Sequence, residues 1–356
     1  MLNRRDVLAG GAAAGLGAVA GCAAPGAWDS VNANLPLRRI GVSSCMDQTR
    51  PQPIWDTVLA DRPDLFLFGG DNVYCQLPYS RARLQEAYAL AGESRNYTRL
   101  RNTVPHMAIW DDNDYGLNDG GGDFAFKAES KDQFLQAWNV SANDERRSRD
   151  GLHHARVFGP PGRRLQVIVL DVRWSRSPWK VTDQRNAPGK ERYLPDVDPS
   201  KTMLGETQWR WLEEQLRESA DVRIVLSGIQ VLADGHGWER WGNFPLERQR
   251  LFDAIARTGA QGMVLLSGDR HFGALYTETR GVPYPLYELT SSGITHPWRE
   301  AAEAGPNRLG ELFTGIHYGM VEIDWEARAL DLQIKDLSAA VQRSQRVSID
   351  QLRVRT

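Results

Sequence analysis

The chain has 356 residues and a formal net charge of −2, with 41% hydrophobic and 25% charged residues. This composition is ordinary for a soluble globular protein, so it excludes a disordered chain, a collagen and a protein with many membrane spans. The near balance of 43 Lys+Arg against 45 Asp+Glu gives no electrostatic reason to expect specific nucleic-acid binding.

The first 22 residues have the features of an export signal. Arg4 and Arg5 stand near the start, before a mildly apolar run of Ala and Gly that is too short to span a bilayer. A twin-arginine pair in this context predicts export by the Tat machinery. Small residues then precede Cys22, as in a bacterial lipobox, where the cysteine is lipidated. The alternative is a disordered leader with a chance cysteine.

These features predict where the mature protein resides. We expect residues 1–22 to be a Tat signal with a lipobox, and residues 23–36 to be a tether. A lipid on Cys22 would anchor the exported protein to the membrane, in the cell envelope or periplasm.

Strands and helices are expected to alternate from residue 39 onward. Short apolar runs predict strands over residues 39–43, 65–68, 104–110, 165–170, 223–226 and 263–266. Apolar residues at helical spacing predict helices around residues 54–60, 84–91, 134–138, 209–216 and 251–255. Alternating apolar residues on either side of a turn at residues 324–327 predict a β-hairpin over residues 318–335.

Local signals predict some of the boundaries. Ser80 is a predicted helix N-cap, Ser130 fits a capping box, and Gly259 is a predicted helix end. Residues 175–203, rich in Pro and charged residues, predict a long surface loop or lid. No repeat or low-complexity linker divides the mature chain, so residues 37–356 are expected to form one α/β domain.

Polar residues, most of them able to bind metals, follow the predicted strands. They are Cys45 and Asp47, Asp71 and Tyr74, Asp111 to Asp114, Asp171 and Arg173, Gln230, and Asp269 and His271. Ligands of open α/β sheets bind outside the carboxyl ends of the strands, so these residues can meet at one site. Any single Asp can be a turn residue or a helix cap, but six strand ends together are hard to explain by capping.

Such a concentration of carboxylates predicts a metal site, because crowded carboxylates repel one another unless a cation neutralises them. Two ions about 3.5–4 Å apart can activate water and hold a phosphoryl group for in-line attack. Cys, Tyr and His suit a transition metal, whereas Asp, Asn and Gln oxygens suit Ca²⁺ or Mg²⁺. Arg173 is a candidate group for binding a phosphate oxygen.

The motifs occur in a specific order between about residues 37 and 295. They are Ser44-Cys45-Met46-Asp47, Gly70-Asp71-Asn72-Val73-Tyr74, Trp110-Asp111-Asp112-Asn113-Asp114, Asp171-Val172-Arg173, Leu204-Gly205-Glu206-Thr207-Gln208-Trp209-Arg210-Trp211-Leu212 and Ser267-Gly268-Asp269-Arg270-His271. This ordered set resembles the alkaline phosphatase D (PhoD-like) family of metallophosphoesterases, which Tat export also fits.

The resemblance implies a four-layer αββα sandwich of the metallophosphoesterase type, with a dinuclear metal site at the strand ends. It also implies Fe(III) plus Ca²⁺, with Mg²⁺ or Mn²⁺ as possible alternatives, and hydrolysis of phosphate esters by a metal-bound hydroxide. The phosphate ester would be either a monoester or a diester.

The resemblance also assigns site residues. Asp71 matches the carboxylate that bridges the metals, and the other implied metal ligands are Cys45, Asp47, Tyr74, Asp112, Asp269 and His271. Gln230 and Asp171 are possible further ligands or supporting residues. The implied catalytic residues are Asp71, Asn113 and Arg173.

One position departs from the family pattern. The family commonly has Trp-Asp-Asp-His where this chain has Asn113 in place of the histidine. That histidine lies beside the leaving group in the superfamily and is a natural general acid, a role that Asn cannot fill. Either another group protonates the leaving group, or the preferred leaving group needs little protonation.

Alternative interpretations remain at this point. Asn113 favours an envelope lipoprotein that binds phosphorylated ligands with little turnover. A serine hydrolase is a third possibility, although the chain has no Gly-x-Ser-x-Gly elbow.

Cys45 and Cys75 can instead form a disulfide in the periplasm. The remaining histidines are expected in solvated loops or on the surface: His153, His154, His236, His296 and His317. The oligomeric state is open.

Overall fold

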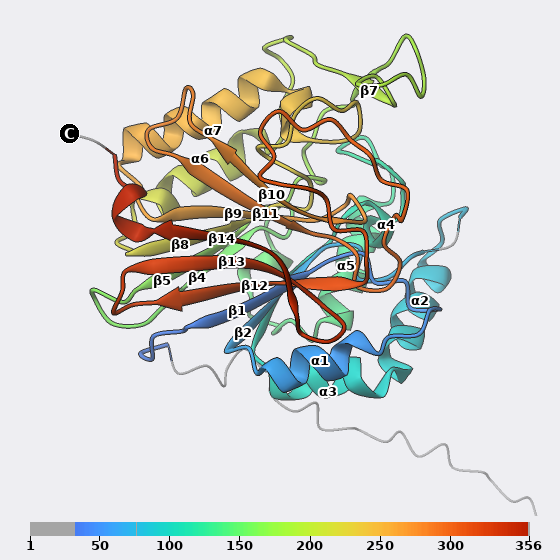
Figure 1. The fold of residues 1–356 in the computed structure, drawn as a ribbon. Helices are drawn as coiled ribbons and strands as arrows, with labels where there is room; N and C mark the ends of the chain where they lie inside the picture. Colours follow the sequence, from blue (N-terminus) through green and yellow to red (C-terminus); the bar gives the residue numbers. More distant parts are fainter. Residues whose placement is uncertain (1–32, 76, 355–356) are drawn as a thin grey trace, which may run out of the picture.

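The computed structural model describes residues 33–75 and 77–354. Two six-stranded sheets lie against each other, with α1 (Ile54–Asp61) and α3 (Arg95–Thr103) outside one sheet and α6 (Gly205–Arg217) and α7 (Pro245–Thr258) outside the other (Figure 1). The expected α/β class and its four-layer arrangement are therefore confirmed. The predicted signal, most of the tether and Cys22 lie outside the described residues.

The first sheet combines parallel strands with a C-terminal antiparallel meander. Its strands are β1 (Arg39–Ser43), β2 (Leu65–Gly69), β3 (His106–Ile109), β12 (His317–Asp324), β13 (Ala329–Asp336) and β14 (Val341–Ser348), in the spatial order β14-β13-β12-β1-β2-β3. β1, β2 and β3 are parallel, so their carboxyl ends lie at the same edge. β12 and β13 form the predicted hairpin, whereas β14 was not predicted.

The second sheet has a parallel centre. Its strands are β4 (His154–Phe158), β5 (Leu165–Val169), β8 (Val222–Leu226), β9 (Met263–Ser267), β10 (Gly273–Glu278) and β11 (Leu286–Ser291), in the spatial order β10-β11-β9-β8-β5-β4. Every residue of β5, β8 and β9 is buried, as expected for apolar runs covered on both faces. β4, β10 and β11 were not predicted.

The remaining elements lie around these layers. They are α2 (Arg81–Glu93), α4 (Asp112–Tyr115), α5 (Lys127–Ala137), the 3₁₀ helices η2 (Glu145–Arg147), η3 (Trp241–Asn243) and η4 (Ile349–Gln351), and the two-residue strands β6 (Lys180–Val181) and β7 (Tyr193–Leu194). β6 and β7 pair within the predicted long loop at residues 175–203. Trp179 of this loop stacks on Phe244 at 4.7 Å between ring centroids, so that part packs on the body of the protein.

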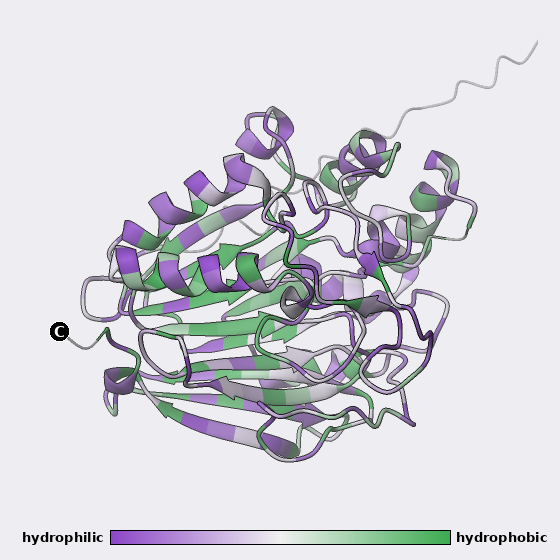
Figure 2. Ribbon diagram, turned by 90° about the horizontal axis from the view of Figure 1, so that it is seen from above, coloured by the Kyte–Doolittle hydropathy of each residue, from purple (hydrophilic) through white to green (hydrophobic). Residues whose placement is uncertain are grey.

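Aromatic residues attach the outer helices to the first sheet. Phe66 and Phe68 are two residues apart on β2, so both side chains lie on one face. Their ring centroids are 5.7 Å and 6.1 Å from that of Trp55 in α1, and Trp55 in turn is 5.6 Å from Tyr97 in α3. Figure 2 shows apolar residues concentrated in the strands and hydrophilic residues on the outer faces of the helices.

The boundary predictions have mixed outcomes. Ser80 caps α2 as predicted, since its hydroxyl accepts a hydrogen bond from the Arg83 backbone N–H at 3.3 Å. Gly259 ends α7 with a φ of 68°, also as predicted. The capping role of Ser130 is wrong, because α5 begins at Lys127 and Ser130 lies buried inside it. The ammonium of Lys127 binds the carbonyl oxygens of residues 122 and 174, which stabilises this earlier start.

Within residues 33–75 and 77–354, no helix combines the length and the apolarity that crossing a membrane requires.

Candidate metal centre

The segments that follow the strands are held together by hydrogen bonds at one edge of the two sheets. The Met46 N–H donates to the Asp71 carbonyl at 2.8 Å, which joins the segments after β1 and β2. The Asn72 N–H donates to the Asp114 carboxylate at 3.2 Å, which adds the segment after β3. The expectation that several strand ends meet is therefore correct.

Glycines allow these segments to approach closely. Gly70 has a φ of +103°, and a Cβ there would lie 2.4 Å from the Cβ of Asp111. A Cβ on Gly268, after β9, would lie 2.4 Å from the Ser44 hydroxyl oxygen. Any larger residue at either position would push the strand ends apart.

Four predicted site residues have left-handed backbone conformations. The φ angles are 62° at Cys45, 49° at Asp71, 70° at Asp269 and 56° at His271. This conformation costs an L-residue about 1–2 kcal/mol, and such residues cluster at functional sites, where the surrounding structure holds them. The backbone therefore supports a functional role for these residues independently of their side chains.

A first group of ligand atoms comes from Cys45, Asp71 and His271, whose ligand atoms all lie within 4.8 Å of one another. The Cys45 Sγ is 3.6 Å from Asp71 Oδ2. The Tyr74 hydroxyl lies 3.2 Å from the same oxygen and 3.4 Å from His271 Nε2. Sulfur, imidazole, phenol and carboxylate together suit a transition metal.

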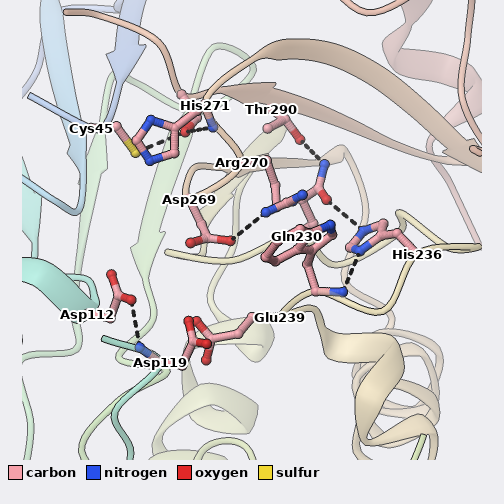
Figure 3. A network of polar contacts seen from close by, with 12 residues as sticks. Cys45, Asp112, Asp119, Gln230, His236, Glu239, Asp269, Arg270, His271 and Thr290 are labelled. Carbon is pink, nitrogen blue, oxygen red and sulfur yellow. Dashed lines mark hydrogen bonds and ion pairs between the residues drawn. The ribbon is translucent and has the colours of Figure 1, made fainter. Parts of the chain in front are cut away.

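Two further groups consist of carboxylates. Asp71, Asp111 and Asp112 form one, and Asp112, Asp119 and Glu239 form the other. Asp71 belongs to both the first and the second group, which is the arrangement needed for a carboxylate that bridges two ions. In the third group only Asp112 was predicted to be a ligand. The Asp119 backbone N–H donates to Asp112 Oδ2 at 2.7 Å (Figure 3).

Asn113 contacts the predicted bridging carboxylate directly. Its backbone N–H donates to Asp71 Oδ1 at 3.0 Å, and its side-chain amide donates to Asp71 Oδ2 at 2.9 Å. The same amide is 3.0 Å from Asp112 Oδ1. Asn113 therefore orients two predicted metal ligands.

Burial and mutual repulsion disfavour the charged forms of these carboxyls. Burial raises the pKa of Asp71 well above its usual value, and the nearby Asp112 raises it further. Burial likewise raises the pKa of Asp269 and brings that of Asp111 to about 8, although Arg173 opposes the shift at Asp111. A bound cation would reverse this effect, because it stabilises the deprotonated ligands.

The stability of the metal-free protein should therefore depend on pH. The pKa is about 8 for Asp111 and about 7 for Asp114 in the folded state, against about 3.9 for an unfolded Asp. A carboxyl group whose pKa is raised by folding contributes its full stabilisation at pH values below its unfolded pKa. This contribution is lost as the pH rises through the folded pKa. Buried histidines whose pKa is lowered, such as His317 with a pKa of about 4, have the opposite effect on the pH dependence of stability. Their effect is confined to pH values below about 6.5. We expect the Tm of the metal-free protein to fall from about pH 7 to about pH 9.

Calorimetric unfolding of chelator-treated protein checks this expectation. Addition of a divalent cation that binds the site should remove most of the fall, because the cation holds the carboxylates deprotonated. A metal-free Tm that stays constant or rises over this pH range would contradict it.

Two predicted site residues have other partners in this structure. The Asp47 carboxylate accepts hydrogen bonds from Thr49 at 2.7 Å and from Arg50 at 2.9 Å. Burial alone would raise the pKa of Asp47, but these hydrogen bonds outweigh burial and lower it. The Gln230 amide binds Tyr276 and Thr290, both at 3.0 Å, and lies 3.1 Å from His236 (Figure 3). Asp47 does not belong to the three ligand groups.

Arg173 is placed differently from the expectation that it binds a phosphate oxygen. Its fully buried guanidinium donates to Asp111 Oδ1 at 2.6 Å and to the two oxygens of Glu239 at 2.8 Å and 2.9 Å. Asp171 supports it, because its carboxylate accepts the backbone N–H of Arg173 at 2.9 Å. Arg173 therefore holds two carboxylates of the site in position rather than facing a substrate.

The structure also tests the other interpretations of the cysteines and histidines. No disulfide joins Cys45 and Cys75. The expectation that His153, His154, His236 and His317 are solvated is wrong, because all four are buried. His296 packs at 4.4 Å from the ring centroid of His271 and 4.8 Å from that of Tyr74, so it adjoins the first ligand group.

Comparison with known proteins identifies the family. The model of the family described as PhoD-like phosphatase matches residues 40–304. The chain belongs to the PhoD-like phosphatase family. It is therefore a metal-dependent phosphoesterase. Four of the seven predicted metal ligands belong to its ligand groups: Cys45, Asp71, Asp112 and His271.

Solved structures share the fold at low sequence identity. The structure of PhoD matches with a TM-score of 0.67 and 17% identity, over 91% of this chain and 70% of that one. Purple acid phosphatase PPD1 from yellow lupin (Lupinus luteus) seeds matches with a TM-score of 0.61 and 12% identity, over 89% of this chain and 54% of that one. No curated protein matches the chain.

Proposed function

We propose that this phosphoesterase uses Fe(III) together with Ca²⁺, or with Mg²⁺ or Mn²⁺ in place of Ca²⁺. The donor set carries this proposal. Cys45, Tyr74 and His271 would hold iron, with Asp71 shared between the two ions. Asp111 and Asp112 supply the oxygen ligands that a harder cation prefers. Asp269 is buried close enough to raise the pKa of Asp71, so it would support the same ions.

The protein's own contribution is to fix these ligands before substrate binds. When bound, the ions would activate water and withdraw negative charge from the phosphoryl oxygens. Asn113 holds Asp71 and Asp112 through its amide, and Arg173 holds Asp111 through an ion pair. Groups oriented in advance stabilise transition-state charge without reorganising during the reaction.

Purified protein is expected to contain iron and to absorb visible light, because phenolate and thiolate ligands give ferric iron charge-transfer bands. Elemental analysis and an absorption spectrum test this expectation. Loss of the band in Tyr74→Phe, with iron still bound, would assign it to the phenolate. Protein that contains only zinc would refute the iron assignment.

The alternative function is an envelope lipoprotein that binds phosphorylated ligands with little turnover, which the Asn113 position favours. Release of nitrophenolate from bis(4-nitrophenyl) phosphate by the metal-loaded protein separates the two functions. Turnover that chelator treatment abolishes and metal addition restores supports the phosphoesterase. Tight phosphate binding without turnover supports the alternative.

We also propose Tat export and lipid anchoring, on the N-terminal sequence alone. Replacing both Arg4 and Arg5 by Lys is expected to leave the protein in the cytoplasm, because the Tat machinery recognises the arginine pair. Cys22→Ser should move the protein out of the membrane fraction or leave it uncleaved. Fractionation and immunoblotting measure both effects, and an unchanged membrane fraction for Cys22→Ser would refute lipidation as the anchor.

A further inference from the structure

The long loop at residues 175–203 contacts the third ligand group. Within it, the hydroxyl of Tyr193 in β7 donates to Asp119 Oδ2 at 2.5 Å. The Arg176 guanidinium donates to the Asp119 carbonyl at 2.6 Å. The backbone of Tyr193 is itself fixed, because its N–H donates to the Gly237 carbonyl at 2.7 Å. Two residues of the loop therefore hold Asp119, one through its side chain and the other through its backbone.

Asp119 in turn holds the predicted metal ligand Asp112. The Asp119 backbone N–H donates to Asp112 Oδ2 at 2.7 Å (Figure 3). The other oxygen, Asp112 Oδ1, accepts from the Asn113 amide at 3.0 Å. Each oxygen of Asp112 therefore has a donor that orients it, and the donor to Oδ2 stays in place only if the backbone at Asp119 does.

The backbone at Asp119 is in a conformation that needs support. Its φ angle is 54°, in the left-handed region that is unfavourable for an L-residue. Asp119 lies in the turn after α4, where the preceding Leu117 and Asn118 are exposed. The hydrogen bonds from Tyr193 and Arg176 reach this residue itself. Loss of the bond from Tyr193 would let the turn relax and draw the Asp119 N–H away from Asp112.

Trp179 of the same loop makes a less critical contact. Its indole N–H donates to Glu239 Oε1. The two oxygens of Glu239 also accept from the buried Arg173 guanidinium at 2.8 Å and 2.9 Å, so Glu239 stays fixed without the loop. Among the described residues, Tyr193 is the one side-chain donor bonded to the Asp119 carboxylate. Tyr193 is therefore the loop residue on which the position of Asp119 depends most.

We propose that Tyr193 is a positioning residue of the metal centre, which fixes the ligand Asp112 through Asp119. The proposal rests on the metal-dependent function proposed above. Asp112 belongs to the carboxylate groups, which suit the harder cation, and not to the first ligand group, which would hold iron. Loss of the link from Tyr193 should therefore weaken the binding of the harder cation and leave iron in place.

Mn²⁺ binding to protein of known iron content tests this link, with free Mn²⁺ measured by electron paramagnetic resonance. Tyr193→Phe should weaken Mn²⁺ binding about 10-fold, as is typical for residues that orient metal ligands. The iron content and the visible absorption band should not change. Asp119→Ala should weaken Mn²⁺ binding to a similar extent. The double variant should be no weaker than either single variant, because both substitutions break the same link.

Asp119→Asn separates an anchoring role of Asp119 from direct metal binding. Asparagine keeps an oxygen acceptor for Tyr193 and tolerates the left-handed backbone, but it has no negative charge. This variant should therefore recover most of the Mn²⁺ affinity that Asp119→Ala loses. Equal losses in the two variants would overturn the proposal, because Asp119 would then act as a ligand itself.

Tyr318→Phe is the matched control. Tyr318 also donates to a carboxylate, at 2.8 Å from Asp61 Oδ2, and Asp61 lies outside the three ligand groups. This variant should keep the wild-type affinity for Mn²⁺. Unchanged Mn²⁺ affinity in Tyr193→Phe would overturn the proposal, and so would additive losses in the double variant or loss of iron together with Mn²⁺. A wild type that binds no Mn²⁺ would refute the second metal position, and with it this proposal.

Discussion

Asp71→Asn is expected to lose most of the bound metal and to lower kcat on the order of 10³-fold. The Asp71 carboxylate contacts Cys45, Tyr74 and Asn113. Asp71 also belongs to both predicted ion sites. An amide has the same shape as the carboxylate but no negative charge, and one of its two ends is a donor. One substitution therefore weakens both ions at once. Elemental analysis and steady-state kinetics measure the two effects.

Asp47→Asn is the matched control for this substitution. Its sequence motif predicts a metal ligand, yet both oxygens of its carboxylate are bonded to neighbouring Thr49 and Arg50. We expect this variant to keep its metal content. Full metal content in Asp71→Asn, with the fold intact by circular dichroism, would contradict the assignment of the bridging residue. Metal loss in Asp47→Asn would restore the role that the motif implied.

The sequence predicts the arrangement of the strand ends well, for a physical reason. Buried parallel strands are short apolar runs, and each run here is followed directly by polar residues such as Cys45, Asp71 or Asp269. Parallel strands end at a common edge, so residues far apart in the chain are brought together without knowledge of side-chain packing. The edge strand β14 has no such signal, because most of its residues are exposed or only partly buried.

The sequence does not predict how the charged groups pair. Arg173 and Glu239 are separated by 66 residues, and nothing in the intervening segment, which contains α6 and β8, indicates that they meet. Glu239 does not directly follow a predicted strand, so the pattern that identified the other carboxylates does not include it. The burial of His236 was not predicted either. It depends on the contact with Gln230, which lies at another position in the loop that follows β8.

Asn113→Ala is expected to lower metal affinity or activity about 10- to 100-fold. We expect this effect because the alanine removes the side-chain donor to Asp71 and Asp112 and leaves two predicted ligands without their orienting amide. Metal titration of the variant measures the loss. Wild-type metal affinity and activity in Asn113→Ala would show that these hydrogen bonds do not support the centre.

Asn113→His tests a different property, the protonation of the leaving group. A simple alcohol leaves poorly as an alkoxide, and general-acid assistance is typically worth about 10²–10⁴-fold, whereas nitrophenolate needs little help. Wild-type rates should therefore fall steeply as the leaving-group pKa rises. The histidine variant should hydrolyse alkyl phosphate esters up to about 10²-fold faster, with a much smaller gain for nitrophenyl esters. The comparison requires equal metal content, because the new side chain also replaces the amide that orients Asp71. If both substrate classes change by the same factor, position 113 does not face the leaving group. The role of Asn113 is then confined to its hydrogen bonds with the predicted metal ligands.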